Sequence, residues 1–303
     1  MRVFVTGATG FVGSAVVDEL IEAGHQVLGL ARSDASAEAL VRAGAEVHRG
    51  TIDDLDGLRS GAASADAVIH TAFDHDFSRF AENCRRDGVA IEALGEALAG
   101  SDRPLLVTSG LAMAVSGRLG HEGDPCLPVS DGYPRASEPT ALLLAARGIN
   151  AATVRLSPTV HGAGDHGFVP ILIDLARRTG RSAYIGDGQN AWSAVHRRDA
   201  AVVFRRAIEA PRAGARWHAI AEERIPFKDI ATAIGERLGV PVVSLSQDEA
   251  PAHFGWFTKF AGLNLAATST VTREALGWTP KHPTLAQDLD DAGYFDLAPD
   301  RQQ

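Results

Sequence analysis

Three glycines in the segment Thr-Gly-Ala-Thr-Gly-Phe-Val-Gly at 6–13 constrain the fold of this chain more than any other feature. An apolar segment at 2–5, which predicts a strand, precedes them, and a segment at 14–23, which predicts a helix, follows them. The first glycine permits a sharp turn, the second lets the backbone approach a pyrophosphate, and the third lets helix and strand pack closely. A strand, a glycine turn and a helix in this order predict the first βαβ unit of an α/β sheet.

The same turn predicts a dinucleotide site. The free N–H groups at the N-terminus of the helix face a bound phosphate and attract its charge. The residues that we assign to the cofactor in this turn are Gly7, Thr9, Gly10, Phe11, Val12 and Gly13. The alternative is a tight turn in which the glycines serve packing alone. The strand, turn and helix context favours the dinucleotide.

The first half of the chain alternates short apolar segments with helical ones. Further strands are predicted at 26–30, 46–48, 67–70, 104–108 and 151–156, and helices at 37–43, 53–59, 79–99 and 139–147. This alternation predicts a Rossmann fold, a doubly wound parallel sheet with helices on both faces. Beyond about 157 the regularity weakens, which predicts a smaller C-terminal lobe of mixed α/β structure. We therefore expect a dinucleotide-binding core at 1–160, a substrate lobe mostly at 161–295 with some segments returning to the core, and a loose tail at 296–303.

In an open α/β sheet the ligand lies beyond the carboxyl ends of the strands. Residues that follow the predicted strands are therefore candidates for contact with the cofactor. Beyond the glycine turn, these candidates are Arg32, Ser33, Thr51, Ile52, Thr71, Ala72, Phe73, Thr108, Pro158 and Val160.

The end of the second strand indicates which dinucleotide binds. An acidic residue there would bond the ribose hydroxyls of NAD and repel a 2′-phosphate. This chain has Arg32, a bidentate phosphate donor, followed by the hydroxyl of Ser33. Asp34 comes one position late, and we expect it to face solvent. The pattern favours NADP(H), with NAD(H) as the alternative if Arg32 is merely a solvated surface arginine.

Composition narrows the class of partner. The net charge of −9 provides no basic stripe, so no nucleic-acid partner is expected. No apolar run reaches the ~18–20 residues of a membrane helix, and the first strand begins too early to leave room for a signal peptide. Two cysteines, Cys84 and Cys126, are too few for a disulfide framework and fit a reducing compartment. We expect a cytoplasmic protein that acts on a small-molecule substrate.

Several motifs together resemble the short-chain dehydrogenase/reductase superfamily in its extended form, which includes the NAD-dependent epimerases and dehydratases. The resemblance covers nearly the whole chain. Its motifs stand at 6–13, 68–72, 106–109, 155–162, 186–199 and 276–280. The resemblance implies a homodimer formed through the helices around 79–99 and 139–147.

The chain departs from this family at the positions that normally carry its catalytic residues. Members carry a serine or threonine after the fifth strand and a Tyr-x-x-x-Lys motif, whose lysine lowers the tyrosine pKa from its usual ~10. Here Gly110 takes the place of the hydroxyl residue, and no lysine occurs before Lys228. Ser137 stands where the lysine would follow Tyr133. The resemblance therefore implies an atypical member, to which the usual mechanism does not transfer.

Tyr133, Arg135 and Ser109 remain as catalytic candidates. Tyr133 could donate a proton to a developing alkoxide, and Arg135 could hold the nicotinamide ribose although a guanidinium cannot relay protons. Ser109 could bond substrate or nicotinamide, or satisfy the backbone at the end of its strand. Because Pro139 disfavours helical geometry at the preceding residue, we expect Tyr133 and Arg135 in an extended segment before the helix. The alternative is a loop tyrosine beside an arginine that pairs with a neighbouring carboxylate.

Histidines and aromatic residues offer further candidates. His161 and His166 could each act as a general acid, since histidine titrates near neutral pH, or could be structural. No metal site is predicted, because His70 and His75 lack a third ligand at metal spacing. Aromatic residues of the C-terminal half would line a pocket for an apolar substrate or form the core of that lobe. They are Phe168, Trp192, Phe254, Trp256 and Phe257.

These features predict an NADP(H)-dependent oxidoreductase that transfers a hydride to a carbonyl or related C=N or C=C group of a small, apolar substrate. The first alternative is a nucleotide-sugar epimerase or dehydratase that keeps NAD tightly bound. The second is a protein without catalytic activity that senses NADP(H) and regulates a partner, an alternative that the missing lysine motivates.

Overall fold

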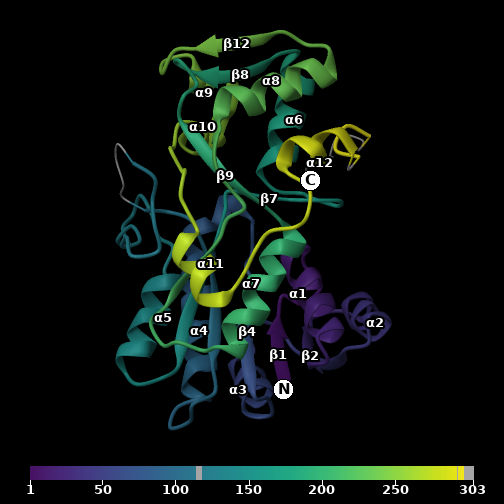
Figure 1. The fold of residues 1–303 in the computed structure, drawn as a ribbon, viewed down its shortest axis with the longest axis vertical. Coiled ribbons are helices and arrows are strands. Elements are labelled where there is room, and N and C mark those ends of the chain that lie inside the picture. Colours follow the sequence, from purple (N-terminus) through teal and green to yellow (C-terminus); the bar gives the residue numbers. More distant parts are fainter. Residues whose placement is uncertain (114–117, 292, 297–303) are drawn as a thin grey trace.

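A parallel sheet forms the middle layer of the lower part of the molecule (Figure 1). The computed structural model describes residues 1–113, 118–291 and 293–296. Within these ranges, seven strands pair in the order β10-β6-β5-β4-β1-β2-β3, and every pairing is parallel. Their bounds are β1 Arg2–Thr6, β2 Gln26–Ala31, β3 Glu46–Arg49, β4 Ala67–His70, β5 Leu105–Gly110, β6 Ala151–Leu156 and β10 Arg216–Ala219. Because β1 lies between β2 and β4, the order reverses beside β1, which is where open α/β sheets bind ligands.

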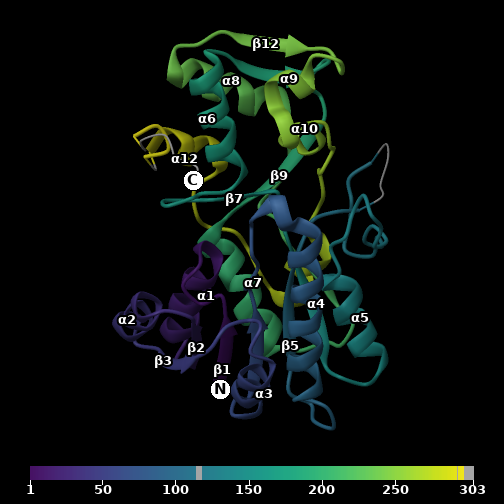
Figure 2. The same cartoon turned by 180° about the vertical axis from the view of Figure 1, so that it is seen from behind.

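Helices cover both faces of this sheet, as the doubly wound prediction requires (Figures 1 and 2). Val3 and Val5 of β1 point into one core, whereas Phe4 between them points into the other, because strand side chains alternate in direction. Both cores are buried, and the predicted Rossmann fold is confirmed. The first core is covered by α1 Phe11–Glu22, α2 Asp34–Ala43 and α7 Arg197–Glu209, and the second by α3 Leu55–Ala63, α4 Phe80–Glu96 and α5 Ser137–Ala146.

Three helices begin earlier than the sequence predicted. One of them, α2, begins at Asp34 instead of 37, because the Ser33 hydroxyl caps it there. Helix α1 begins at Phe11 instead of 14, because the extended Gly10 precedes it and the small Gly13 fits within its first turn. Helix α5 begins at Ser137, so Glu138 is helical and our expectation of a non-helical Glu138 was wrong. Pro139 is tolerated because it lies in the first turn, where a backbone N–H has no partner within the helix.

The C-terminal half contributes a third core, which is built on aromatic side chains, among them the buried Trp192, Phe227 and Phe257. A three-stranded sheet of order β11-β9-β7 and a parallel pair of β12 and β8 lie in this lobe, above the central sheet in Figure 1. The strand bounds are β7 Thr159–His161, β8 Ser182–Ile185, β9 Ala191–His196, β11 Glu222–Pro226 and β12 Val242–Leu245. The helix bounds are α6 Phe168–Thr179, α8 Phe227–Leu238, α9 Ala250–Phe254, η2 Gly255–Phe257, α10 Thr258–Ala261 and α12 Leu285–Asp291.

Three elements beyond residue 160 belong to the central sheet and its cover. Helix α7 packs against α1, β10 pairs with the edge of β6, and α11 Thr270–Leu276 packs on α7 and β10. The expected division of the chain at 160 and 295 stays a prediction. Of the expected tail, only Asp296 lies within the described residues. No helix in the described part of the chain is long and apolar enough to cross a membrane.

Candidate functional site

The turn between β1 and α1 forms a cradle that only glycine fits. Gly7 has a φ of +66°, and a Cβ there would lie 2.6 Å from the backbone nitrogen of Ala72. A Cβ on Gly13 would overlap the Gly7 carbonyl oxygen and lie 2.8 Å from Thr71 Oγ1. The turn therefore packs directly on the segment that follows β4, because Gly7 and Gly13 carry no side chain that would hold the two segments apart.

The start of α1 is open to an anion. Gly10 caps the helix with no side-chain hydrogen bond, so the N–H groups of the first turn are available to a phosphate. The Arg197 guanidinium carbon lies 5.0 Å from the centre of the Phe11 ring, and it adds positive charge beside the cradle. The His166 ring packs edge-on against Phe11, with the ring centres 5.7 Å apart. These residues fit the pyrophosphate of a dinucleotide.

The other predicted cofactor residues gather at the same edge of the sheet, because the carboxyl ends of parallel strands all lie there. Arg32 and Ser33 follow β2, whereas Thr51 and Ile52 follow β3. Thr71, Ala72 and Phe73 follow β4, Thr108 lies near the end of β5, and Pro158 and Val160 follow β6. The Thr108 hydroxyl is buried and has no hydrogen-bond partner among the described residues. Contact between these residues and a cofactor stays a prediction.

The end of β2 leaves one basic group unpaired. Arg32 is exposed and makes no hydrogen bond or ion pair within the described ranges. Asp34 faces solvent as expected, since 89% of its side chain is exposed, and it accepts a hydrogen bond of 2.8 Å from Arg49 of β3. The Ser33 hydroxyl caps α2 by accepting from the Ser36 N–H.

Tyr133 and Arg135 lie in the irregular segment that leads into α5, as predicted. Desolvation raises the pKa of Tyr133 to about 12, although the nearby charge of Arg135 acts in the opposite direction. The Arg135 guanidinium carbon lies 3.7 Å from the centre of the Phe73 ring, at the cofactor edge of the sheet. Arg135 Nε donates to the Ser137 hydroxyl at 2.8 Å. Tyr133 is therefore a protonated phenol at neutral pH, close to a cation.

At the end of β5, the position that faces open space is a glycine, Gly110, and the neighbouring Ser109 hydroxyl is used by the backbone. The buried Ser109 hydroxyl lies 3.4 Å from the Gly110 carbonyl oxygen, to which it donates. Gly110 is exposed, and a Cβ there would meet no atom within 4 Å. Space for the hydroxyl residue typical of the family is therefore present at Gly110, but the side chain is not.

His161 lies away from solvent in a cluster of histidines and carboxylates. It is fully buried, and its Nδ1 lies 2.6 Å from Asp288 Oδ2. Its ring packs edge-on against His196, which stacks on His282. Burial lowers the pKa of His196 to about 4. These contacts join β7, β9 and α12, and they favour the structural alternative for His161, whereas the exposed His166 packs beside the cradle.

Sequence reasoning missed a buried hydrogen-bonded chain beneath the site. His70 bridges Thr6 and Asp87, and Asp87 accepts from Ser137, the residue at the place of the missing lysine. Only the position of Ser137 was visible in the sequence, because Asp87 is brought to it by packing of α4 against α5.

Aromatic side chains connect the cofactor edge to the C-terminal lobe. We call Phe73, Phe77, Phe80, Phe168, Trp256 and Phe260 the aromatic cluster. Phe77 stacks on Trp256 with ring centres 4.8 Å apart, and Phe73 packs on Phe80 at 6.1 Å. Trp256 is half exposed, whereas Trp192, Phe254 and Phe257 are buried in the lobe core. Figure 2 shows the start of α4 reaching toward β9 of the C-terminal lobe.

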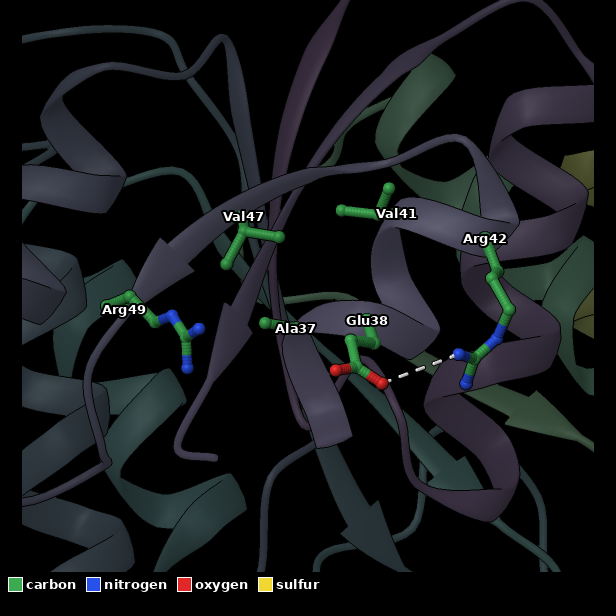
Figure 3. A pocket seen from close by; sticks show the side chains of 6 residues that line it. All are labelled: Ala37, Glu38, Val41, Arg42, Val47 and Arg49. Atoms are coloured by element: carbon green, nitrogen blue, oxygen red, sulfur yellow. Dashed lines mark ion pairs between the residues drawn. The ribbon is translucent and has the colours of Figure 1, made fainter. Parts of the chain in front are cut away.

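A groove of about 640 Å³ lies elsewhere, between α2 and the edge strand β3 (Figure 3). It is lined by Ala37, Glu38, Val41, Arg42, Val47 and Arg49. Glu38 and Arg42 pair across one turn of α2 at 3.8 Å. The groove opens widely to solvent and holds none of the catalytic candidates, so we assign the candidate site to the cradle and the aromatic cluster.

The chain has close relatives of unassigned activity. It is 50% identical over 300 residues to the uncharacterized protein C2A9.02 of Schizosaccharomyces pombe, over 97% of this chain and 100% of that protein. It is 44% identical over 291 residues to the uncharacterized protein YLL056C of Saccharomyces cerevisiae, over 95% of this chain and 98% of that one. A 2-alkyl-3-oxoalkanoate reductase of Stenotrophomonas maltophilia is 28% identical over 264 residues, or 80% and 77% of the two chains.

A solved structure and a family model agree with the fold. The UDP-glucose 4-epimerase of Thermus thermophilus in complex with NAD superposes with a TM-score of 0.73 at 19% identity, over 96% of this chain and 100% of that one. The model of the NAD dependent epimerase/dehydratase family matches residues 3–220. The nicotinamide dinucleotide for which this family is named suits the glycine cradle and the open start of α1. The chain belongs to the NAD-dependent epimerase/dehydratase family, among the extended short-chain dehydrogenases/reductases.

Proposed function

We propose that this protein is an NADP(H)-dependent oxidoreductase that reduces a carbonyl, or a related C=N or C=C group, of a small apolar substrate. The observation that carries the proposal is the continuity of the aromatic cluster with the cradle. Phe73 lies under Arg135 at the cofactor edge and continues through Phe80 and Phe77 to Trp256. Apolar walls with a few polar groups suit an apolar ketone better than a charged sugar nucleotide.

The chain's own residues have separate roles in this proposal. The cradle holds the pyrophosphate, Arg32 the 2′-phosphate, and Arg135 the ribose next to the nicotinamide. The nicotinamide, when bound, supplies the hydride that reduces the carbonyl carbon. The Tyr133 phenol donates the proton that completes the alcohol, so the oxygen gains a proton as the carbon gains the hydride. The aromatic cluster excludes water from the substrate.

Replacing Tyr133 with phenylalanine tests the reaction. We expect kcat for NADPH-driven ketone reduction to fall by roughly a hundredfold or more, the usual contribution of a general acid, while NADPH affinity stays unchanged. The measurement is NADPH oxidation across a panel of aromatic and aliphatic ketones, imines and enones. Activity of the variant equal to wild type would remove Tyr133 from the mechanism. Purification with bound NAD and no NADPH consumption would favour the epimerase.

The pH dependence follows from the raised pKa of Tyr133. Because the phenol keeps its proton until about pH 12, Tyr133 causes no loss of reduction between pH 6 and pH 9. The reverse oxidation needs the phenolate, so its kcat/KM is expected to rise about tenfold per pH unit across that range. Profiles of kcat/KM in both directions test this. A kcat/KM for reduction that falls as the pH rises through 7 would contradict this expectation.

Replacing Arg32 with alanine tests the choice of cofactor. Since Arg32 is unpaired at the end of β2, we expect NADPH affinity to fall about tenfold or more, the value of a charge-assisted hydrogen bond, while NADH affinity changes little. Titration of both dinucleotides by their fluorescence gives the two dissociation constants. Arg42→Ala, on the outer groove, is the matched control. Equal effects of Arg32→Ala on both cofactors would exclude an NADP(H) preference based on this residue.

The proposal also includes a cytoplasmic location, a small-molecule substrate and a homodimer through α4 and α5. Val89 on α4 and Leu143 on α5 support such an interface, because 43% and 63% of their surfaces are exposed.

A further inference from the structure

A chain of hydrogen bonds runs through the protein interior from the glycine turn to Arg135. Thr6 Oγ1 lies 2.8 Å from His70 Nδ1, and His70 Nε2 lies 3.0 Å from Asp87 Oδ1. Ser137 Oγ donates to Asp87 Oδ2 at 2.5 Å, and Arg135 Nε donates to Ser137 Oγ at 2.8 Å. We call Thr6, His70, Asp87, Ser137 and Arg135 the buried relay.

One arrangement of protons satisfies every bond in this relay. The Thr6 hydroxyl donates to His70 Nδ1, and His70 Nε2–H donates to one oxygen of Asp87. The Ser137 hydroxyl donates to the other oxygen, and Arg135 donates to Ser137. Thr6, His70, Asp87 and Ser137 are all buried, so the bonds among these four residues do not compete with solvent, whereas the bond from Arg135 to Ser137 is partly buried. A buried polar network with every member paired fixes side-chain positions.

Charge balances along the relay as well. Burial alone would raise the pKa of Asp87, but hydrogen bonds from His70 and Ser137 and the charge of Arg135 lower it below its usual range. Asp87 is therefore ionised, and a buried carboxylate needs a compensating cation. Arg135 supplies it through one hydroxyl group. This arrangement fixes the position of the Arg135 guanidinium through Nε alone and leaves Nη1 and Nη2 unused by it.

The outer end of Arg135 remains available to a ligand. Its Nε is used by Ser137 and its face by Phe73, whereas Nη1 and Nη2 have no hydrogen-bond or ion-pair partner among the described residues. Two parallel N–H donors on one planar group match two adjacent oxygens, such as a carboxylate or the cis-diol of a ribose. Tyr133 lies near the same guanidinium, since the charge of Arg135 acts on its phenol.

We propose that Asp87, acting through Ser137, fixes Arg135 so that Nη1 and Nη2 bind the cis-diol of the nicotinamide ribose. Asp87 is then a positioning residue. Ser137 stands where the family has a lysine, and it joins Asp87 to Arg135 by hydrogen bonds instead of supplying a positive charge itself. The inference rests on the proposed function, because it requires a nicotinamide dinucleotide. Thr6 ties the relay to the cradle, since its carbonyl oxygen also accepts from Thr71 Oγ1 at 2.7 Å.

A double-mutant cycle on dinucleotide affinity tests this coupling. Arg135→Ala should weaken NADPH binding about tenfold, the value of a hydrogen bond to a charged group. Asp87→Asn and Ser137→Ala should each weaken it several-fold. Each double variant with Arg135→Ala should bind no more weakly than Arg135→Ala alone, because all three substitutions remove the same contact. If Asp87→Asn fails to fold, the Ser137→Ala cycle carries the test.

A second ligand tests binding of the adenosine half of the cofactor separately from binding of the nicotinamide half. Adenosine 2′,5′-bisphosphate carries the adenosine ribose and its phosphates but lacks the nicotinamide ribose, so its affinity should be unchanged in all these variants. Ile91→Val, a buried change on α4 outside the relay, is the control for a general loss of packing and should change neither affinity. Equal weakening of both ligands, or additive effects in the cycle, would overturn the inference. Absence of NADPH binding to the wild-type protein would instead overturn the proposed function.

Discussion

Replacing Gly13 with alanine is expected to abolish dinucleotide binding and to destabilise the fold. The added Cβ would overlap the Gly7 carbonyl oxygen and approach Thr71 Oγ1 to 2.8 Å. The carbonyl belongs to the backbone, so the whole turn must move rather than one flexible side chain. Overpacking of this kind costs about 1–3 kcal/mol. We expect NADPH affinity to fall by roughly a hundredfold or more, because the turn can no longer approach the pyrophosphate.

Gly88→Ala is the matched control, since it adds the same methyl group inside a helix. A Cβ on Gly88 would meet no atom closer than Thr140 Oγ1 at 3.6 Å, which is ordinary contact. Alanine favours a helix over glycine by about 1 kcal/mol, so this variant should be as stable as the wild type or more so. Urea unfolding and NADPH titration measure both effects. A folded Gly13→Ala protein with wild-type affinity would show that the cradle does not hold the cofactor.

The second large effect is expected from Arg155→Met. Arg155 is fully buried on β6, and it donates to both carboxylate oxygens of Glu138, at 2.7 and 2.6 Å. It also donates to the Asp124 carbonyl oxygen at 2.8 Å. Removing the guanidinium leaves the buried Glu138 charge without its cation, which costs about 3–5 kcal/mol. This is a large part of the ~5–15 kcal/mol that stabilises a typical domain.

Two further variants show whether the lost charge pair causes this effect. Arg59→Met breaks an exposed pair with Glu96, which should change the free energy of unfolding by less than about 1 kcal/mol. Arg155→Met combined with Glu138→Leu removes both charges and should recover much of the stability, since apolar residues can replace a buried ion pair. Urea unfolding measures all three proteins. If the double variant is as unstable as Arg155→Met, packing rather than charge explains the loss.

The parts of the fold that local chemistry determines could be predicted from the sequence. The glycine turn, the strand segments and the alternation of helices gave the Rossmann fold, because each depends on residues close in the chain. Helix starts were less accurate: glycine at 13 delayed the predicted start of α1, although its small size is what allows the helix to begin at Phe11. Local sequence also placed Tyr133 and Arg135 before α5, through Pro139 near the start of that helix.

The interior of the candidate site could not be predicted in this way. The buried relay joins residues 17, 50 and 64 positions apart, and no local pattern brings His70, Asp87 and Ser137 together. Phe77 was missed for a related reason, since its stacking partner Trp256 comes from the other lobe. Asp34 shows the same difficulty in a small way, because its partner Arg49 is supplied by the next strand.

Strand β10 also determines the order in which this protein becomes complete during synthesis. Until residues 216–219 leave the ribosome, the hydrogen-bonding edge of β6 stays open. The face of α1 that α7 covers is bare during the first part of this interval, until residues 197–209 emerge. At roughly 5–20 residues per second, this interval lasts on the order of 3–13 s. An uncapped strand edge beside an apolar helix face is a substrate for chaperones and for aggregation. Stalled nascent chains in which residues 216–219 are still inside the ribosome should therefore be more sensitive to protease than stalled chains in which these residues have emerged.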